Sequence, residues 1–230
     1  MNEKTLVSRE CELKFSITSD EEERALVKKM ESLGFSHKSH NLESDYTPDV
    51  QGFLCRENGL ILRFRVQEGD IPDVLITLKI SGKSKEFQDN YEVEYYTSRF
   101  DAEKLKTINA YLKQAAGHTL PNGINNLNDI QSLRKLLANN GFTEHRMLSQ
   151  KKRSVYESNE AKIAIDEFPK GIGKYIEIEA NTPEELFAAA ANLGLDKDNA
   201  EKRNYGEIIK DKQKTLPENE KRTLIFDNVE

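Results

Sequence analysis

Charged and apolar residues alternate in short segments along this chain, and the alternation restricts what those segments can form. In RECELKF, residues 9–15, Glu10, Glu12 and Lys14 alternate with apolar residues. Side chains two positions apart lie on the same face of a β-strand, so we expect a strand with one charged and one apolar face. Such a face is most simply a solvated surface, unless the rest of the chain indicates a bound ligand.

The same alternation predicts strands in further segments. Together with the first strand, they lie at about 6–17, 53–66, 74–80, 90–96, 150–157, 161–168 and 174–180. Their charged positions are Arg63, Arg65, Lys79, Glu92, Glu94, Lys151, Arg153, Asp166, Glu177 and Glu179. Acidic pairs and basic pairs occupy separate strands, although neighbouring like charges repel by about 0.2–1 kcal/mol. This segregation favours a ligand of mixed charge over a chance surface pattern.

Helices are predicted between and after the strands. Capping boxes that begin at Ser19 and Thr182 indicate two of them. Further helices are expected at about 101–116, 127–140 and 197–212. We therefore expect a single domain over residues 1–213 with a helical insert at about 101–140, and a mobile C-terminal tail over 214–230.

The overall composition argues against several classes of protein. The chain has 230 residues and a formal net charge of −6, which does not suit a general nucleic-acid-binding protein, because phosphate contacts need a basic surface. No apolar run is long enough to cross a bilayer, and no signal-peptide core follows Met1. Two cysteines do not suggest a disulfide framework. We expect a cytoplasmic protein that binds neither nucleic acid nor membranes.

Two architectures explain the charged strand faces. In an open sheet with helices on its apolar side, the charged side is the solvated one. In a closed barrel the charges line the interior, where their burial is costly unless water, pairing or ligands compensate. Acidic pairs are suitable ligands for Mg²⁺ or Mn²⁺, and Arg and Lys pairs bind phosphate oxygens. The two sets together fit a metal-bound polyphosphate.

Glu-x-Glu-x-Lys at residues 10–14 resembles the signature of the CYTH superfamily, also called triphosphate tunnel metalloenzymes. The segments LRFR, LK, YEVE, KKR, IDEF, GKYIEIE and NYGEII follow in the order that this resemblance requires, over roughly residues 8–210. The resemblance implies an α+β fold, an antiparallel eight-stranded β-barrel (the triphosphate tunnel) with helices packed outside. It also implies that triphosphate compounds bind there with one or two divalent metal ions, Mg²⁺ or Mn²⁺.

The resemblance also implies roles for individual residues. The implied metal ligands are Glu10, Glu12, Glu92, Glu94, Asp166, Glu177 and Glu179. The implied phosphate-binding residues are Lys14, Arg63, Arg65, Lys79, Lys151, Arg153 and Lys202. Lys202 is expected on the C-terminal helix, and Arg203 is an alternative to it. Asp45 and Tyr46 lie where the family has a further motif, but the match is loose there and they receive no role.

The leading hypothesis is a metal-dependent hydrolase of inorganic triphosphate or of a nucleoside or thiamine triphosphate. Lys14 would stabilise charge on the phosphates, and Glu10 or Glu12 would orient the attacking water. A class IV adenylate cyclase, which forms cyclic AMP and diphosphate from ATP, would use the same triphosphate grip. A polyphosphate-binding protein without catalysis is the third hypothesis. The expected partner is a small-molecule triphosphate, and a homodimer stays open as the oligomeric state.

Overall fold

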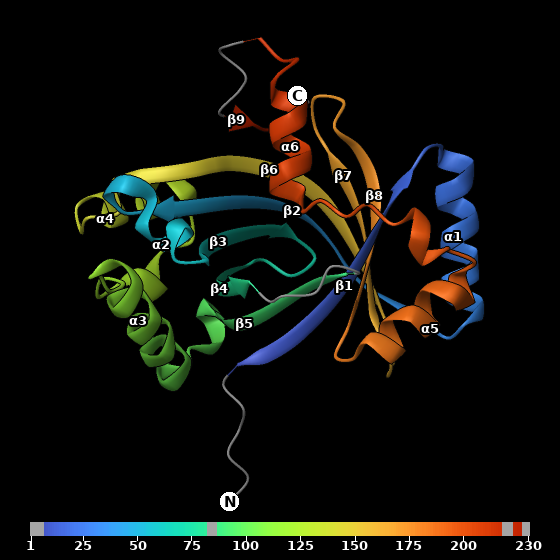
Figure 1. The fold of residues 1–230 in the computed structure, drawn as a ribbon, viewed down its shortest axis with the longest axis horizontal. Helices are drawn as coiled ribbons and strands as arrows, with labels where there is room; N and C mark the ends of the chain where they lie inside the picture. Colours follow the sequence, from blue (N-terminus) through green and yellow to red (C-terminus); the bar gives the residue numbers. More distant parts are fainter. Residues whose placement is uncertain (1–6, 82–86, 218–222, 227–230) are drawn as a thin grey trace, which may run out of the picture. The chain divides into compact units, whose positions relative to one another are not determined.

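Figure 1 shows the fold in a computed structural model, which describes residues 7–81, 87–217 and 223–226. The strands are β1 (Ser8–Ile17), β2 (Ser36–Asp49), β3 (Leu60–Gly69), β4 (Asp73–Ser81), β5 (Gln88–Tyr96), β6 (Glu144–Glu157), β7 (Lys162–Phe168), β8 (Gly173–Ala180) and β9 (Thr223–Leu224). The α-helices are α1 (Asp20–Ser32), α2 (Leu54–Glu57), α3 (Ala102–Ala116), α4 (Ile130–Ala138), α5 (Pro183–Leu193) and α6 (Tyr205–Gln213). Short 3-10 helices are η1 (Gln51–Phe53), η2 (Thr97–Arg99), η3 (Ile124–Asn126) and η4 (Lys197–Asn199).

The strands hydrogen-bond in the order β2-β3-β4-β5-β1-β8-β7-β6-β9, and a further pairing joins β2 to β6. The β2–β6 pairing closes the sheet formed by the eight strands β1 to β8, which is the topology of an antiparallel eight-stranded β-barrel. The predicted fold class, an α+β barrel with helices outside, is confirmed. The chain divides into two compact units, and each is described by itself.

The first unit comprises residues 1–9, 43–82 and 90–149. In its antiparallel sheet of β3, β4 and β5, Phe64 lies opposite Ile76 and Leu78 lies opposite Val93. These side chains share one hydrophobic core with residues of α3 and α4, among them the fully buried Ile108. The two helices of the predicted insert therefore cover the apolar face of this sheet.

The second unit comprises residues 10–42, 83–89 and 150–230. Here β1 pairs with β8, β8 with β7, and β7 with β6, all antiparallel. Their apolar residues, such as Phe15 and Ile176, form a core with Met30 of α1 and Leu186 of α5. Figure 1 shows α1 and α5 side by side. The charged face of these strands is the one opposite to this core.

β2 occupies a segment for which the sequence does not predict a strand. Three of its buried positions are Ser39, Asn41 and Glu43, which are polar. The usual signal of a half-buried strand is an alternation of apolar and polar residues, and that signal is missing here. A strand whose buried side is polar is therefore invisible to a search for hydrophobic periodicity.

The strand predicted over 53–66 is wrong at its start. Residues Leu54–Glu57 form α2, and β3 begins only at Leu60. Gly59 turns the chain from the helix into the strand with a φ of 73°, a conformation that favours glycine. Cys55 is buried on α2, so the apolar residues before this glycine belong to a helix face.

The helix starts predicted from capping residues are confirmed. At α5 the Thr182 hydroxyl accepts from the Glu185 N–H, and the Glu185 carboxylate accepts from the Thr182 N–H. At α1 the Ser19 hydroxyl accepts from the Glu22 N–H, but the Glu22 carboxylate accepts from Thr18 instead. The first helix therefore begins where expected, with only half of the reciprocal capping box.

The single helix predicted over 197–212 is wrong. The 3-10 turn Lys197–Asn199 and a stretch without helix precede α6, which begins at Tyr205. Asn204 caps α6, because its side chain accepts from the Glu207 N–H at 3.0 Å. Asn204 therefore begins a new helix rather than continuing an earlier one, and residues 200–203 before it are not helical.

Part of the predicted C-terminal tail belongs to the sheet. Thr223–Leu224 form β9 beside β6, and Leu224 is fully buried. The Phe226 N–H donates to Gln150 Oε1 at 3.0 Å. Residues 218–222 and 227–230 of this tail lie outside the described residues.

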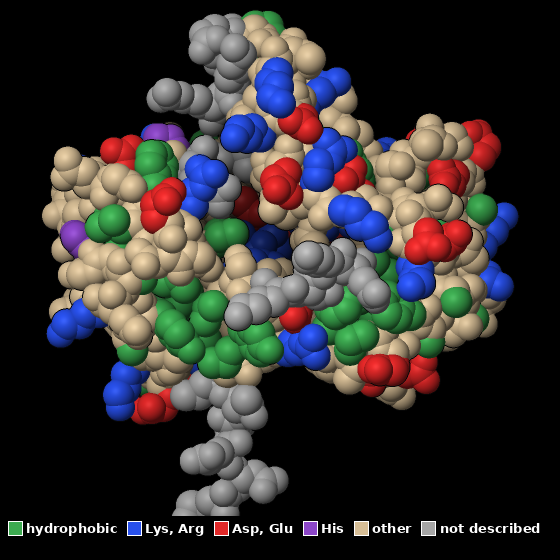
Figure 2. Space-filling model, viewed as in Figure 1, with side chains coloured by type: hydrophobic (Ala, Val, Ile, Leu, Met, Phe, Trp, Pro, Cys, Tyr) green, Lys and Arg blue, Asp and Glu red, His purple; other side chains and the backbone are tan. Residues whose placement is uncertain are grey.

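The face of the molecule in Figure 2 shows Lys and Arg side chains gathered over α6, with acidic side chains among them. Lys210 and Lys212 lie in the last turn of that helix, where positive charge interacts favourably with the helix dipole. None of the helices in the described ranges has the length and apolarity needed to cross a membrane.

Candidate functional site

The strand register of the second unit brings charged side chains of β1, β8 and β7 onto one face. Glu12 lies opposite Glu179, and Lys14 lies opposite Glu177. Glu179 in turn lies opposite Lys162 on β7. Directly opposed side chains in a sheet are close enough to interact. Each of these carboxylates therefore has a cation within reach, on its own or on a neighbouring strand.

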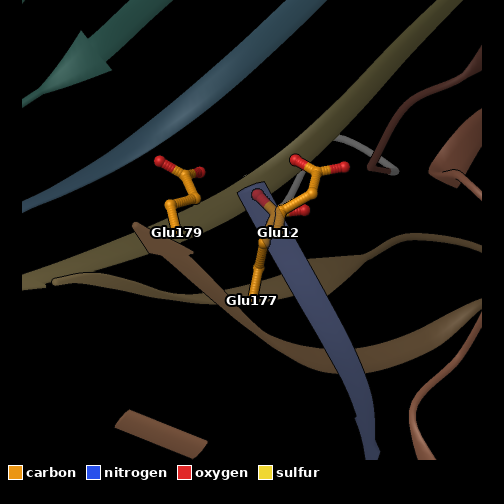
Figure 3. Close-up of side chains that lie close together, drawn as sticks. All are labelled: Glu12, Glu177 and Glu179. Atoms are coloured by element: carbon orange, nitrogen blue, oxygen red, sulfur yellow. The ribbon is translucent and has the colours of Figure 1, made fainter. Parts of the chain in front are cut away.

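Glu12, Glu177 and Glu179 form a group of buried carboxylates, shown in Figure 3. One carboxylate oxygen of each lies within 4.8 Å of the others. The three residues are 6%, 4% and 8% exposed, so water screens their mutual repulsion poorly. Carboxylate oxygens are the ligands that Mg²⁺ and Mn²⁺ prefer, and a divalent cation would neutralise this group. The donor set therefore fits the cation that the sequence predicts.

Lys14 is the most deeply buried cation of this group. Its Nζ lies 3.2 Å from Glu177 Oε2 and 3.6 Å from Glu12 Oε1, and the side chain is 1% exposed. The Glu201 N–H donates to the Lys14 carbonyl oxygen at 2.7 Å, which ties the segment before α6 to β1. Lys14 thus contacts two carboxylates of the group, and its single positive charge compensates part of their negative charge.

Arg153 and Lys151 of β6 bind Asp166 of β7. Arg153 donates from Nε to Asp166 Oδ1 at 2.7 Å and from Nη2 to Oδ2 at 2.6 Å. Lys151 Nζ donates to Oδ2 at 3.2 Å. Arg153 Nη2 also donates to Glu177 Oε1 at 2.6 Å. Glu177 lies opposite the small Ala164 of β7, which leaves room for this diagonal contact.

These cations keep two of the buried carboxyl groups ionised. Burial raises the pKa of Glu177, but Lys14, Arg153 and Lys151 outweigh it and hold that pKa well below its usual range. Burial acts on Asp166 in the same sense, and there Arg153 and Lys151 lower the pKa below its usual value. Glu177 and Asp166 are therefore anions that the basic residues of β1 and β6 compensate.

Glu179 behaves differently from Glu177. Burial raises the pKa of Glu179 to about 7; Lys162 opposes the rise, while the charges of Glu10 and Glu177 add to it. Glu10 is partly exposed and lies two residues before Glu12, on the same face of β1. Burial and two neighbouring carboxylates therefore oppose the negative charge of Glu179, and a further cation at this carboxylate would relieve both effects.

Tyr205, the first residue of α6, lies against the ammonium groups of the cluster. Lys14 Nζ lies 4.4 Å and Lys151 Nζ lies 5.2 Å from the centroid of its ring. The ring also packs on Phe168, with centroids 4.7 Å apart. A cation over an aromatic face is attracted by the charge distribution of the ring. Burial, with the Asp166 carboxylate next in effect, raises the pKa of Tyr205 well above its usual value, so the phenol stays neutral.

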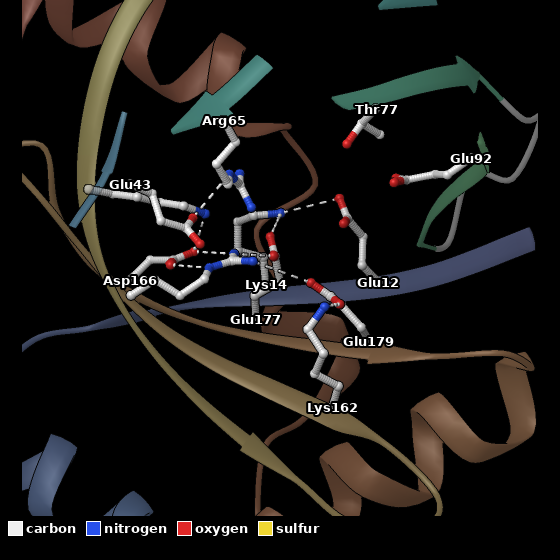
Figure 4. A network of polar contacts seen from close by, with 12 residues as sticks. Glu12, Lys14, Glu43, Arg65, Thr77, Glu92, Lys162, Asp166, Glu177 and Glu179 are labelled. Atoms are coloured by element: carbon white, nitrogen blue, oxygen red, sulfur yellow. Dashed lines mark hydrogen bonds and ion pairs between the residues drawn. The ribbon is translucent and has the colours of Figure 1, made fainter. Parts of the chain in front are cut away.

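The first unit holds a second charged group, centred on Arg65 of β3. Its guanidinium donates from Nε to Asp45 Oδ1 at 2.7 Å and from Nη2 to Asp45 Oδ2 at 2.9 Å. Arg65 Nε also lies 3.1 Å from Glu43 Oε2, and Glu43 accepts from Gln67 Nε2 at 2.9 Å. Two carboxylates of β2 therefore hold this arginine, and Figure 4 shows its contact with Glu43.

The other predicted residues of the first unit lie in neighbouring rows of the β3-β4-β5 sheet. Arg63 Nη2 donates to Thr77 Oγ1 at 3.2 Å, and the Thr77 hydroxyl donates to Glu94 Oε2 at 3.2 Å. Lys79 forms an ion pair with Glu92, its direct neighbour on β5. The structure thus places all the predicted residues of this unit on one face of the sheet, with the basic side chains on β3 and β4 and the acidic ones on β5.

Lys202 does not lie on the C-terminal helix, which is a correction to the sequence-based expectation. It lies in the segment before α6, is exposed, and donates from Nζ to the Lys197 carbonyl oxygen at 3.3 Å. Arg203 is also exposed, and its guanidinium pairs with Glu201 and Asp211. Lys202 and Arg203 are thus exposed to solvent, whereas the basic residues Lys14, Lys151 and Arg153 are buried.

Lys162, Tyr205 and Asp45 contact predicted site residues but are absent from the prediction. Lys162 has the same two-residue phase as Ala164 and Asp166, so the alternation was sufficient to identify it. Asp45 lies on the strand that hydrophobic periodicity does not reveal. Tyr205 comes from a helix, where strand periodicity gives no signal.

Comparison with protein families agrees with this geometry. The family model that matches is that of the CYTH domain, over residues 8–205. Among curated proteins, no significant match to the chain is found. The matched range includes the buried charged residues of β1, β6, β7 and β8, which are Glu12, Lys14, Lys151, Arg153, Asp166, Glu177 and Glu179.

Three solved structures that share the fold come from two archaea and one bacterium. A conserved hypothetical protein from Pyrococcus furiosus is 19% identical, with a TM-score of 0.60 over 86% of this chain and 99% of that chain. The PH1012 protein from Pyrococcus horikoshii is 19% identical, with a TM-score of 0.59 over 86% and 98%. A candidate adenylate cyclase from Vibrio parahaemolyticus is 20% identical, with a TM-score of 0.59 over 88% and 98%. At these identities the likeness shows the fold alone.

Proposed function

Because the chain belongs to the CYTH domain family, we propose that it is a metal-dependent hydrolase of triphosphate compounds. The substrate class comprises inorganic triphosphate and the nucleoside or thiamine triphosphates, which share the three linked phosphoryl groups. The reaction adds water to the terminal phosphorus and breaks the bond to the bridging oxygen. Inorganic triphosphate would then yield orthophosphate and diphosphate.

The observation that carries the proposal is the meeting of buried acidic and basic groups on one strand face. Glu12, Glu177 and Glu179 offer oxygens within 4.8 Å of one another. Lys14 and Arg153 lie 3.2 and 2.6 Å from Glu177. A metal-bound polyphosphate matches both sets, because its cation needs the carboxylates and its phosphate oxygens need the basic groups.

Glu12, Glu177 and Glu179 would hold a divalent cation, which would supply Lewis-acid chemistry at the phosphate oxygens. Lys14 and Arg153, which now neutralise Glu177, would then donate to those oxygens. Their positive charge stabilises the negative charge that spreads over the phosphate in the transition state.

Asp166 and Glu10 have different parts in this proposal. Asp166 is fully buried and accepts from both Arg153 and Lys151, so it holds these two cations in position. Glu10 is partly exposed on the same face as Glu12 and is not part of the closely spaced carboxylate group. We therefore assign to Glu10 the orientation of the attacking water.

The charged residues of the first unit keep, as a proposal, the roles that family membership implies. Arg63, Arg65 and Lys79 would bind phosphate oxygens, and Glu92 and Glu94 would be metal ligands. Arg65 is already bound on two sides by carboxylates of β2. Among the described residues Arg63 donates to the Thr77 hydroxyl and to no carboxylate, so it is the more available phosphate ligand of the two.

Product analysis tests the proposal. The protein is incubated with Mg²⁺ and either inorganic triphosphate or ATP, and the products are identified by ³¹P NMR and chromatography. We expect metal-dependent release of orthophosphate and diphosphate from triphosphate, and its loss in Glu12→Gln. Glu21→Gln is the matched control, because Glu21 is an exposed carboxylate on α1 that pairs with Arg24.

Two other results would contradict hydrolysis and identify another function. Cyclic AMP and diphosphate from ATP would identify an adenylate cyclase. Tight triphosphate binding by the folded protein without any product would identify a polyphosphate-binding protein. The three outcomes can be told apart, because hydrolysis, cyclisation and binding without turnover give different products or none.

A further inference from the structure

Lys162 brings to the buried carboxylates an ammonium group that the proposed function does not use. It lies directly opposite Glu179 in the β7–β8 register, and its Nζ forms an ion pair with Glu179 Oε2. Figure 4 shows the two side chains pointing toward one another. The carboxylate that Lys162 binds is one of the three that would hold a divalent cation.

Lys162 differs in exposure from the other cations that contact Glu177 and Glu179. The side chains of Lys14 and Arg153 are 1% and 6% exposed, whereas that of Lys162 is 40% exposed. A lysine has a flexible stem, so its ammonium can move into water while the stem stays on the protein surface. Lys14 and Arg153 are enclosed and lack this route.

Lys162 and a divalent cation would compete for the carboxylate of Glu179. An ammonium in contact with this carboxylate repels a metal ion that approaches the same oxygens. Without any cation, a buried carboxylate beside Glu12 and Glu177 is strongly destabilising. Both conditions are satisfied if the ammonium is present in the metal-free state and absent from the metal-bound state.

We propose that Lys162 is a displaceable counter-ion of the metal site. It neutralises Glu179 when no metal is bound, and it moves toward solvent when a divalent cation binds. Lys162 therefore stabilises the metal-free protein and lowers its affinity for metal. The inference rests on the proposed function, because it needs a metal at Glu179, but it concerns metal affinity rather than turnover.

Calorimetric titration of the full chain with Mn²⁺, without phosphate compounds, tests this proposal. Lys162→Met keeps the length of the side chain and removes its charge. We expect this variant to bind Mn²⁺ about tenfold more tightly than the unsubstituted protein, because the competing charge is gone. Lys174→Met is the matched control, since Lys174 lies on β8 but pairs with Asp20 and Glu23 of α1. We expect its Mn²⁺ affinity to be unchanged.

Thermal unfolding in the presence of a chelator gives a second readout. Lys162→Met should unfold at a lower temperature than the unsubstituted protein, because Glu179 loses its counter-ion, and saturating Mn²⁺ should remove this difference. Lys162→Arg keeps the charge and binds a carboxylate through two donors, so it should bind Mn²⁺ no more tightly than the unsubstituted protein. Lys162→Gln also removes the charge and keeps a polar side chain, so it should bind Mn²⁺ more tightly, and its affinity decides the matter if Lys162→Met does not fold.

Three results would overturn the inference. The first is equal or weaker Mn²⁺ binding by folded Lys162→Met, with normal binding by the unsubstituted protein, and it would leave the proposed function intact. The second is tighter Mn²⁺ binding by Lys162→Arg, which would show that charge at this position does not oppose the metal. The third is no Mn²⁺ binding by any of the folded proteins, which would remove the metal site and the proposed function as well.

Discussion

Arg153 and Asp166 form a two-point ion pair between β6 and β7, with donor–acceptor distances of 2.7 and 2.6 Å. Asp166 is fully buried and Arg153 is 5% exposed. The Arg153 Nη2 group also reaches Glu177 Oε1 at 2.6 Å. One guanidinium therefore bridges two buried carboxylates, and one of them is a proposed metal ligand. The same contact thus fixes the positions of a proposed phosphate-binding residue, Arg153, and of a proposed metal ligand, Glu177.

Replacing Arg153 with Lys should destabilise the metal-free protein by about 1–3 kcal/mol. Lysine cannot make the parallel pair of bonds to Asp166, so a buried oxygen loses its donor. Urea unfolding in the presence of a chelator measures the change. Arg203→Lys is the control, because Arg203 is exposed and surface ion pairs contribute about 0–1 kcal/mol. Equal unfolding midpoints for the two variants would contradict this account of the bridge.

Glu177 and Glu12 should differ in how much they stabilise the metal-free protein. Glu177 lies 3.2 Å from Lys14 and 2.6 Å from Arg153, whereas the Lys14 contact of Glu12 is 3.6 Å long. Glu177→Gln leaves two buried cations without their shared anion, which should destabilise by about 3–5 kcal/mol. Glu12→Gln should destabilise by less than half as much. Chemical unfolding of both variants checks the order, and a reversed order would show that the ion pairs are assigned wrongly.

Arg63 and Arg65 should separate binding from stability in the first unit. Arg65 is held by Asp45 and Glu43, so Arg65→Ala should lower the free energy of unfolding by about 3–5 kcal/mol. Arg63 has one hydrogen bond to Thr77, so Arg63→Ala should change stability little and weaken triphosphate binding. Calorimetric titration with triphosphate, together with urea unfolding, measures both quantities. Normal triphosphate affinity in Arg63→Ala would exclude this arginine as a phosphate ligand.

Tyr205 should act through its ring rather than its hydroxyl. The centroid of the ring lies 4.4 Å from Lys14 Nζ. The attraction between an ammonium group and an aromatic ring is about 0.5–2 kcal/mol when the pair is partly desolvated. Tyr205→Phe should therefore keep triphosphate affinity, whereas Tyr205→Leu should weaken it by roughly three- to thirtyfold. Titration of both variants with triphosphate tests this. Similar losses in both would assign the effect to the hydroxyl.

The charged face could be predicted because alternation in a strand is a local property of the sequence. Glu177 and Glu179 alternate with isoleucines, and those isoleucines do lie in the core of the second unit. The register that brings Glu179 opposite Glu12 is not local, since it joins residues far apart in the chain. The CYTH resemblance supplied this part of the fold, because pairing between distant strands cannot be read from periodicity.

Lys202 and β2 show where the sequence was insufficient. Lys202 was expected on a helix, but the cap at Asn204 begins α6 after it. β2 buries polar residues such as Glu43, whose carboxylate accepts from Gln67 on another strand. Partners of this kind are tertiary contacts, so a polar strand cannot be distinguished from a loop by local pattern. The two-residue phase of Lys162, in contrast, was present in the sequence.

The central claim is that Glu12, Glu177 and Glu179 hold a divalent cation, and Mn²⁺ binding followed by electron paramagnetic resonance tests it most directly. Free Mn²⁺ gives a strong signal that decreases when the ion binds protein. We predict saturable binding by the unsubstituted protein and at least about tenfold weaker binding by Glu179→Gln, which loses a charged ligand but keeps the size of the side chain. Equal affinity of the two folded proteins would contradict the claim, because the cation would then lie elsewhere.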